Sequence, residues 1–467
     1  MSSSPPTSCE KLSLGTKVAW GFGGVADNLI MNVPMLLAMP IYNIGLHLNP
    51  AALGAAMLIP GAIDAFLNPL VGNITDNTRS RWGRRRPYIA IGSLVPAIML
   101  PLLWMPPVTT TSGMFWYILV SFFIYYFFYT VFVVPYTALG YELTTDYNDR
   151  TRVLAWRMYI GVGASLSTPW LYKICALPAF GNIVIGARFV SLGIAVLIVV
   201  TGLIPAIFCR ERTEAQAQPQ VSLRSALKYT ANNKPFLFML GTYIVILSGF
   251  LTSCALQLYV NIYYVCKGNH ELAGTLVGMF GTIVAGLSYV SLPLFTWIST
   301  HWGKRPAMVA SLSLSMSGTL VLWLTMGPLN PYLQMTAAVF FGLSLQGCWL
   351  LISSMVADIC DEDELRTGMR REGVYSAVTA LSLKLAVAMT SLLSGLCLTL
   401  AHFDAAAADR DGIPVQVITN LRLFYFGAQG LAFSIGAVLF CFYPISRERA
   451  LETRRILDER KQLMVNS

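Results

Sequence analysis

Twelve long apolar stretches divide the chain, and they constrain its fold more than any other feature. A helix of about 20 residues crosses the hydrocarbon core of a bilayer, and each stretch is about that long or longer. With 55% hydrophobic and only 12% charged residues, the composition excludes a soluble protein. We therefore expect an all-α polytopic membrane protein with twelve transmembrane helices in two groups of six. The stretches cover residues 18–46, 51–75, 87–106, 113–143, 152–175, 182–208, 236–266, 271–299, 306–326, 331–359, 373–402 and 418–444.

The polar segments between these stretches predict three parts. Residues 1–208 form an N-terminal six-helix bundle with a polar tail, residues 209–235 a linker, and residues 236–467 a C-terminal six-helix bundle with a basic tail. Lysine and arginine concentrate in alternate loops, in the linker and in the C-terminal tail, so both termini and the linker are predicted to be cytoplasmic in a cell (inner) membrane. The net charge of +9 reflects this topology, and we expect no nucleic-acid partner.

The two halves repeat. Trp82-Gly83-Arg84-Arg85-Arg86-Pro87 is matched 220 residues later by Trp302-Gly303-Lys304-Arg305-Pro306. After the fourth and tenth stretches, Glu142 with Arg150 matches Asp358 with Arg366. Two parallel six-helix repeats resemble the major facilitator architecture, in which substrate binds at the midplane and access alternates. The repeated charges predict a cytoplasmic gate formed by Arg84, Arg85, Glu142, Arg150, Asp358 and Arg366.

Three ionisable residues fall in the middle of apolar stretches: Asp27, Asp64 and Lys384. Such residues are costly in a membrane and generally face a ligand path or each other, so a transport site and an internal salt bridge are both open interpretations. Asn68 lies one helical turn after Asp64 on the same face. Oxygen ligands at this spacing suit Na⁺, the one metal ion that we expect, whereas a single buried carboxylate equally suits a proton.

Aromatic and basic side chains supply further candidates. Tyr125, Tyr129, Phe132 and Tyr136 form a helical stripe that favours packing, with Tyr136 retained as a substrate contact because it follows Pro135. Trp349, between small residues, is a second candidate ring. Arg157 is either a loop charge or a ligand for hydroxyl groups. The histidines and nine cysteines show no spacing typical of a metal site or catalytic triad, so we expect neither an enzyme nor a cofactor.

Several motifs together resemble the glycoside-pentoside-hexuronide:cation symporter family. They are Gly21-Phe22-Gly23-Gly24 followed by Asp27, the run from Asp64 to Pro69, Ser80-Arg81-Trp82-Gly83, Met355-Val356-Ala357-Asp358, and Tyr375-Ser376 leading to Lys384. The match spans nearly the whole chain.

This resemblance implies site residues. Asp64 and Thr130 correspond to cation ligands, Asp27 and Arg157 to partners of sugar hydroxyls, Trp349 to a sugar-site aromatic, and Lys384 to a lysine that faces both sites. The chain departs from the family at Asn68, where a second cation-site aspartate is expected. It also departs at Val133 and Thr137, which replace a sugar-site aspartate and a tryptophan.

The combined interpretation is a secondary active transporter, functional as a monomer, that couples uptake of a sugar, glycoside or uronide to H⁺ or Na⁺. A lysolipid or other amphiphile carrier and an uncoupled sugar facilitator are the alternatives. A Na⁺ site built from Asp27, Asp64, Thr130 and the Asn68 amide oxygen has one negative charge fewer than a site with a third carboxylate, so the sequence favours H⁺ as the coupling ion.

Overall fold

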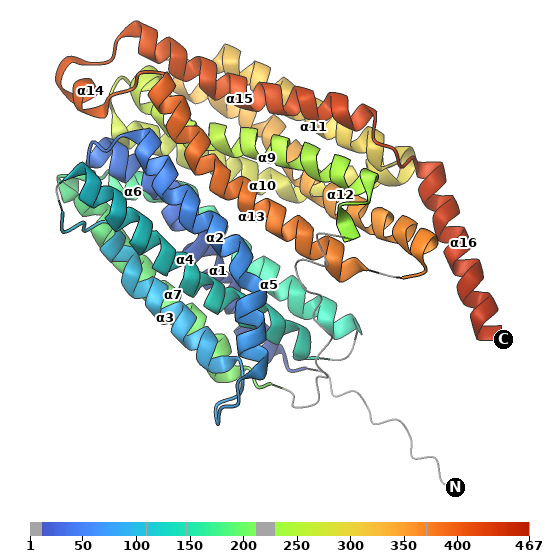
Figure 1. The fold of residues 1–467 in the computed structure, drawn as a ribbon. Helices are drawn as coiled ribbons and strands as arrows, with labels where there is room; N and C mark the ends of the chain where they lie inside the picture. Colours follow the sequence, from blue (N-terminus) through green and yellow to red (C-terminus); the bar gives the residue numbers. More distant parts are fainter. Residues whose placement is uncertain (1–11, 109, 145–146, 212–228, 370, 467) are drawn as a thin grey trace. The chain divides into compact units, whose positions relative to one another are not determined.

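Helices make up nearly all of the computed structural model, which describes residues 12–108, 110–144, 147–211, 229–369 and 371–466 (Figure 1). No strand occurs in these residues. The chain forms two compact units. The first, the N-terminal unit, contains residues 1–41 and 66–219, and the second, the C-terminal unit, contains residues 42–65 and 220–467. The boundary between the units therefore passes through a helix, α2, between Ala65 and Phe66, while the domain limits expected from the sequence stay a prediction.

The N-terminal unit is a bundle in which α1 packs against α5 and α7, and α3 packs against α4 and α7. Glycines allow these approaches: a Cβ at Gly92 of α3 would lie 2.5 Å from the main-chain nitrogen of Phe132 on α4. Its elements, with η1 and α2 shared between the units, are α1 (Leu14–Met39), η1 (Pro40–Gly45), α2 (Pro50–Asn77), α3 (Arg86–Leu103), α4 (Thr111–Glu142), α5 (Tyr147–Ser167), η2 (Thr168–Trp170), α6 (Leu171–Cys175), η3 (Pro178–Phe180) and α7 (Ile183–Phe208).

In the C-terminal unit α9 packs against α13 and α15, and α11 packs against α12 and α15, which repeats the packing of the first unit, while α10 also packs against α12. Asn233 and Asn269 cap the first turns of α9 and α10 through their side-chain oxygens, as expected at helix starts. Its elements are α9 (Lys234–Val260), η4 (Asn261–Val265), α10 (His270–Trp302), α11 (Lys304–Thr325), η5 (Pro331–Gln334), α12 (Met335–Thr367), α13 (Glu372–Leu400), α14 (Ala405–Asp411), α15 (Val415–Cys441) and α16 (Arg447–Asn466).

Eleven helices in the described residues are long and apolar enough to cross a membrane. The one expected span that is not among these eleven, residues 152–175, falls on α5, η2 and α6. α5 is less apolar because it carries charged residues such as Asp149, Arg152 and Arg157. The structure also divides this stretch, since α5 ends at Ser167 and a 3₁₀ turn containing Pro169 separates it from α6. Proline disfavours continuation of a helix at this point.

The first helix of each half ends in a π-helical segment. η1 completes α1, and η4 completes α9. π-helical turns contain one extra residue relative to an α-helix and are frequent at functional sites. In the C-terminal unit the Tyr259 hydroxyl donates to Asn43 Oδ1 over 3.1 Å, and both side chains are buried.

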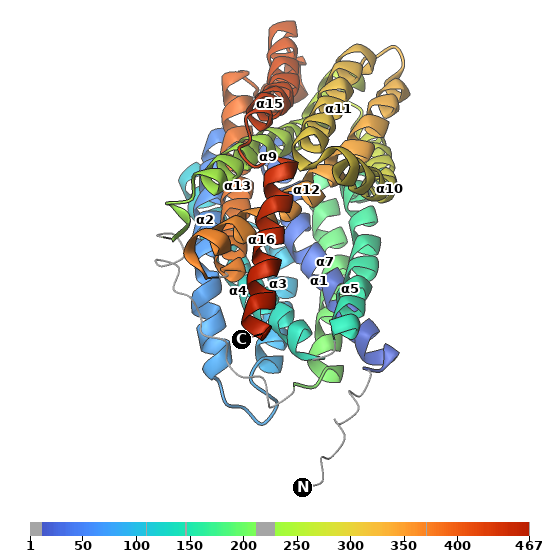
Figure 2. The ribbon, with the colours of Figure 1, turned by 90° about the vertical axis from the view of Figure 1, so that its right-hand side faces the viewer.

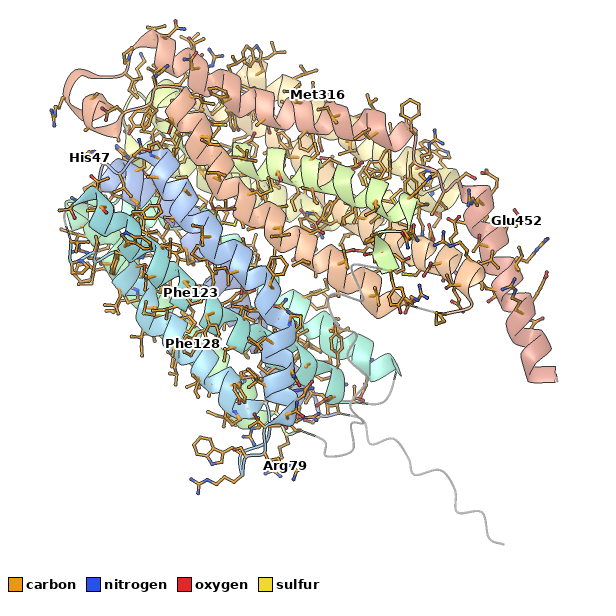
Figure 3. The ribbon with its side chains drawn as sticks, viewed as in Figure 1. His47, Arg79, Phe123, Phe128, Met316 and Glu452 are labelled. Atoms are coloured by element: carbon orange, nitrogen blue, oxygen red, sulfur yellow. The ribbon has the colours of Figure 1, made fainter. Side chains whose placement is uncertain are left out.

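The basic tail expected after residue 444 contains α16, which follows α15 and packs against the end of α12 (Figure 2). Arg449 pairs with Glu362 of α12, and Leu457 is buried. Many side chains on the outer faces of the bundles are apolar and exposed, as at Phe123 of α4 (Figure 3), which is the pattern of a surface in contact with lipid. Residues 1–11 of the predicted N-terminal tail and 212–228 of the predicted linker lie outside the described residues.

Candidate functional site

A polar cluster within the N-terminal unit joins α1, α4 and α5 around Asp27. Arg157 Nη2 lies 2.7 Å from Asp27 Oδ2, and the Tyr129 hydroxyl donates to Asp27 Oδ1 over 3.0 Å. The side chains of Asp27 and Arg157 are 18% and 25% exposed. One carboxylate thus accepts from a charged and a neutral donor, an arrangement in which charge-assisted hydrogen bonds are strong.

Local sequence explains why this cluster forms. Gly24 lies one turn before Asp27, and a Cβ there would lie 3.0 Å from Arg157 Cγ. Gly21 faces the main chain of Trp156 in the same way. These glycines let α1 and α5 approach closely enough for the arginine to reach the carboxylate. Arg157 therefore points to Asp27 and is not a loop charge.

Two rings hold the Arg157 guanidinium in place. Its carbon lies 5.3 Å from the ring centroid of Tyr136 and 5.8 Å from that of Trp20, within the range of cation–π attraction. Tyr136 is fully buried, and its hydroxyl donates to the Trp20 carbonyl over 2.9 Å. Its contact with substrate stays a prediction, while the structure gives it a contact with Arg157.

The other tyrosines of the stripe on α4 are also buried, as the packing interpretation predicts. Tyr129 nevertheless has a polar role that the sequence analysis missed. The helical spacing of Tyr125 and Tyr129 indicates that both rings lie on one face of α4. This spacing alone does not show which of the two hydroxyl groups lies next to a charged residue.

A second polar contact lies within the C-terminal unit. Lys384 Nζ on α13 is 2.7 Å from Asp64 Oδ2 on α2, with side-chain exposures of 18% and 8%. Small residues let these helices meet, because Gly61 of α2 faces Ala388 of α13 with a Cβ-to-Cβ distance of 3.0 Å if Gly61 were alanine. The two mid-membrane residues Asp64 and Lys384 are therefore an ion pair.

The remaining candidates lie on separate elements. Asn68 is half-buried on α2, one turn after Asp64, and Thr130 is fully buried on α4. Trp349 of α12 is 38% exposed and meets Tyr243 edge to face at 5.8 Å. An apolar cavity of about 20 Å³ borders both rings, which is too small for a sugar. The roles of these residues as ligands stay predictions.

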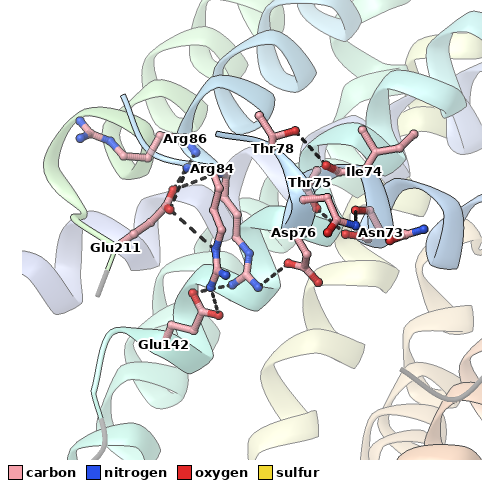
Figure 4. Close-up of polar contacts among 12 residues, drawn as sticks. Asn73, Ile74, Thr75, Asp76, Thr78, Arg84, Arg86, Glu142 and Glu211 are labelled. Carbon is pink, nitrogen blue, oxygen red and sulfur yellow. Dashed lines mark hydrogen bonds and ion pairs between the residues drawn. The ribbon is translucent and has the colours of Figure 1, made fainter. Parts of the chain in front are cut away.

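A charged cluster surrounds the loop between α2 and α3 (Figure 4). Arg84 Nη2 lies 2.6 Å from Glu142 Oε1 and Arg85 Nη1 lies 2.8 Å from Glu142 Oε2, while Arg85 Nη2 also pairs with Asp76 over 2.8 Å. Glu211, which sequence reasoning missed, accepts from main-chain N–H groups of this loop. We call these five residues the α2–α3 loop cluster.

The C-terminal unit contains the matching pair. Lys304 Nζ lies 2.6 Å from Asp358 Oδ1, so the repeated sequence places a base and an acid together in each half. Arg366 is largely exposed and lies 3.6 Å from Asp363, a buried acid that also pairs with Arg371. The side chain of Arg150 lies outside the described residues. The gating role of these residues stays a prediction.

No group of three or more His, Cys, Asp or Glu side chains that could hold a metal occurs in the part of the chain that the structure describes. The carboxylates are instead paired with bases. The polar clusters therefore offer charged and hydroxyl groups for a polar ligand or a small cation.

Known proteins resemble the chain over nearly its full length. The model of a family described as MFS/sugar transport protein matches residues 19–447. An uncharacterized symporter, sll1374, from Synechocystis is 27% identical, covering 97% of this chain and 98% of that protein. The isoprimeverose transporter of Lactiplantibacillus pentosus is 24% identical, covering 97% and 92%. A crystal structure of the nucleoside transporter NupG superposes with a TM-score of 0.63 at 15% identity, covering 92% of this chain and 98% of that one.

Proposed function

Because the chain belongs to the family of MFS/sugar transport proteins, we propose that it is a membrane carrier for cation-coupled symport of a sugar, glycoside or uronide by alternating access. The observation that carries this proposal is the contact of Asp27 with Arg157 and Tyr129. A carboxylate, a guanidinium and a phenol can together accept from and donate to vicinal hydroxyl groups. The same set offers little to the alkyl chain of an amphiphile, so the geometry favours the sugar over the lysolipid alternative.

The ion pair between Asp64 and Lys384 supports coupling to a cation. The Lys384 ammonium lies 2.7 Å from the carboxylate, so a cation that binds Asp64 has to compete with it. A proton needs one carboxylate oxygen, whereas Na⁺ requires several oxygen ligands of which Asn68 and Thr130 would be uncharged. Each missing unit charge about 4 Å from the ion is worth about 4 kcal/mol at an effective dielectric constant of 20. We propose H⁺ as the coupling ion for this reason.

The deciding experiment is uptake of radiolabelled sugars, starting with isoprimeverose and glucuronides, into proteoliposomes with an imposed pH gradient, an imposed Na⁺ gradient or neither. We expect accumulation with the pH gradient, and loss of accumulation but not of exchange in Asp64→Asn. In Asn68→Asp a second carboxylate one turn from Asp64 should strengthen dependence on Na⁺. Accumulation that requires Na⁺ and ignores the pH gradient would refute the proton assignment. Uptake that only equilibrates would identify a facilitator, and uptake of lysolipid alone would refute the sugar proposal.

The positions of the basic residues also support a proposal for the orientation of the chain in the membrane. Arg84 and Arg85 lie between α2 and α3, and Arg86 is the first residue of α3. Lys17 at the start of α1 pairs with Asp149 at the start of α5 over 2.8 Å. Since basic loops stay on the cytoplasmic side, we place both termini and the α2–α3 loop cluster in the cytoplasm. We also propose that the monomer of the carrier is the functional unit and that the chain catalyses no chemical reaction.

A further inference from the structure

The carboxylate of Glu211 occupies the amino end of α3. Its Oε2 accepts from the main-chain N–H of Arg84 over 2.9 Å, and its Oε1 accepts from those of Arg85 and Arg86 over 2.8 and 3.2 Å (Figure 4). The N-cap residue of α3, Arg85, makes no side-chain cap of its own. Glu211 therefore satisfies N–H groups that the first turn of a helix leaves without partners, and its negative charge suits the positive end of the helix dipole.

The loop is shaped to receive this side chain. Gly83 has a φ of +100°, and a Cβ at this position would lie 2.7 Å from Glu211 Oε1. A glycine is thus required for both the turn and the approach of the carboxylate. The Glu211 side chain is only 12% exposed, so its charge is held in a largely closed environment.

Two of these three residues, Arg84 and Arg85, supply the basic side chains of the α2–α3 loop cluster. With their main-chain nitrogens held by Glu211, the Arg84 and Arg85 side chains extend toward Glu142. Burial acts to lower the pKa of Arg84, but the hydrogen bond and charge of Glu142, together with the charges of Asp76 and Glu211, outweigh burial and raise the pKa. Arg86 turns the other way and donates to the carbonyls of Ala206 and Ile207 at the end of α7.

In the described residues of the second half, a base stands where the first half has this acid. Gly303 matches Gly83 and has a φ of +96°, but the side chain nearest to it belongs to Arg447. Arg447 donates to the His301 carbonyl over 2.6 Å. An acid from the start of the linker therefore holds the first loop, whereas a base from the start of α16 lies against the second.

We propose that Glu211 is a positioning residue, which fixes the main chain of Arg84, Arg85 and Arg86 and so directs the two arginines to Glu142, coupling the start of the central linker to the charged loop. The effect on transport rests on the proposed function. The local effect on the loop does not, and it can be measured in purified protein without substrate.

The first measurement is hydrogen exchange of the amides in residues 83–90. In Glu211→Gln, which keeps the shape but removes the charge, we expect exchange at 84–86 to accelerate about tenfold, because hydrogen bonds to charged groups are lost or weakened. Glu211→Asp should restore part of the protection. Glu142→Gln removes one ion-pair partner of each guanidinium but leaves the main-chain bonds to Glu211, so it should change exchange at these amides much less. The control is Glu459→Gln, which removes the charge of an acid on α16 whose side chain is 62% exposed and should leave exchange at residues 84–86 unchanged.

A native thiol gives the second measurement. Cys209, two residues before Glu211, is fully buried, and burial raises its pKa to about 12. In Glu211→Gln the start of the linker should open more often, so alkylation of Cys209 by a maleimide, followed by mass spectrometry, should accelerate about tenfold. Cys175, equally buried on α6, reports general unfolding in the same sample and should not change. Equal acceleration at both thiols, or none at Cys209, would overturn the proposal.

The third measurement separates positioning from a purely local cap. If Glu211 acts through the arginines, the uptake rates of Glu142→Gln and of the double variant with Glu211→Gln should be the same, whereas independent effects would multiply. Multiplying effects would overturn the proposal.

If Glu211→Gln does not fold, the wild-type protein still provides a test, since the amides of Arg84 and Arg85 should exchange more slowly than those of Lys304 and Arg305. Equal rates in the two loops would refute it.

Discussion

The ion pair between Asp64 and Lys384 yields the sharpest prediction. In Lys384→Ala the ammonium 2.7 Å from Asp64 Oδ2 is removed, and at an effective dielectric constant of 20 their Coulomb attraction is about 6 kcal/mol. Desolvation of both charges opposes that attraction, and removal of one partner from a buried pair typically costs about 3–5 kcal/mol. Asp64 is 8% and Lys384 18% exposed, so we expect a loss near the lower limit, about 3 kcal/mol.

The test compares this variant with the double variant Asp64→Asn, Lys384→Ala. Thermal unfolding in detergent should show a clear loss for Lys384→Ala and recovery of most of it when Asp64 is also neutralised, because the charge that was left buried is gone. Coupled uptake should be absent from the double variant, since Asp64 carries the proposed cation, and Lys384→Ala should lose more transport than folded protein. If the double variant is as unstable as the single variant, the pair does not account for the cost. If Lys384→Ala loses folded protein and transport in equal proportion, the pair is a structural salt bridge only.

Three further predictions test other parts of the molecule. Tyr129→Phe removes a hydrogen bond to the Asp27 carboxylate and should raise the KM for sugar about tenfold with little change in stability; an unchanged KM in uptake assays would exclude it from the site. Neutralising Arg84 and Arg85 together should favour the inward-facing state, so that thiol labelling of a cysteine placed in the outer cleft decreases; unchanged labelling would refute the gate. Gly140→Ala places a methyl group into the ring of Trp20 and should cost about 1–3 kcal/mol in thermal unfolding, whereas Gly163→Ala, with no atom within 4 Å, is the matched control and should be neutral.

Residues whose partners lie in a repeated or helical pattern could be predicted from the sequence. The offset between Trp82 and Trp302 anticipated that Glu142 and Asp358 would occupy equivalent places, and each does meet a base. The apolar stretches anticipated most spanning helices. The exception is the stretch 152–175. The hydropathy pattern did not show that its helix, α5, ends at Ser167.

Contacts between distant segments could not be predicted in the same way. Glu211 lies more than 120 residues from the N–H groups that it accepts from, and nothing in a polar linker distinguishes a buried acid from a solvated one. For Lys384 the sequence left Asp27 and Asp64 as equal candidates. The structure pairs it with Asp64 and gives Arg157 to Asp27, because only packing decides which helices meet.

The paired π-helical segments have a consequence for the history of the chain. A π turn is an α-helix with one residue inserted, and η1 and η4 begin at Pro40 and Asn261, close to the 220-residue offset that relates Trp82 to Trp302. One insertion before the duplication of the half explains both segments, whereas separate insertions would require two events at equivalent places. We infer that the insertion arose in an ancestral six-helix gene before that gene was duplicated and fused, and that both descendants kept it.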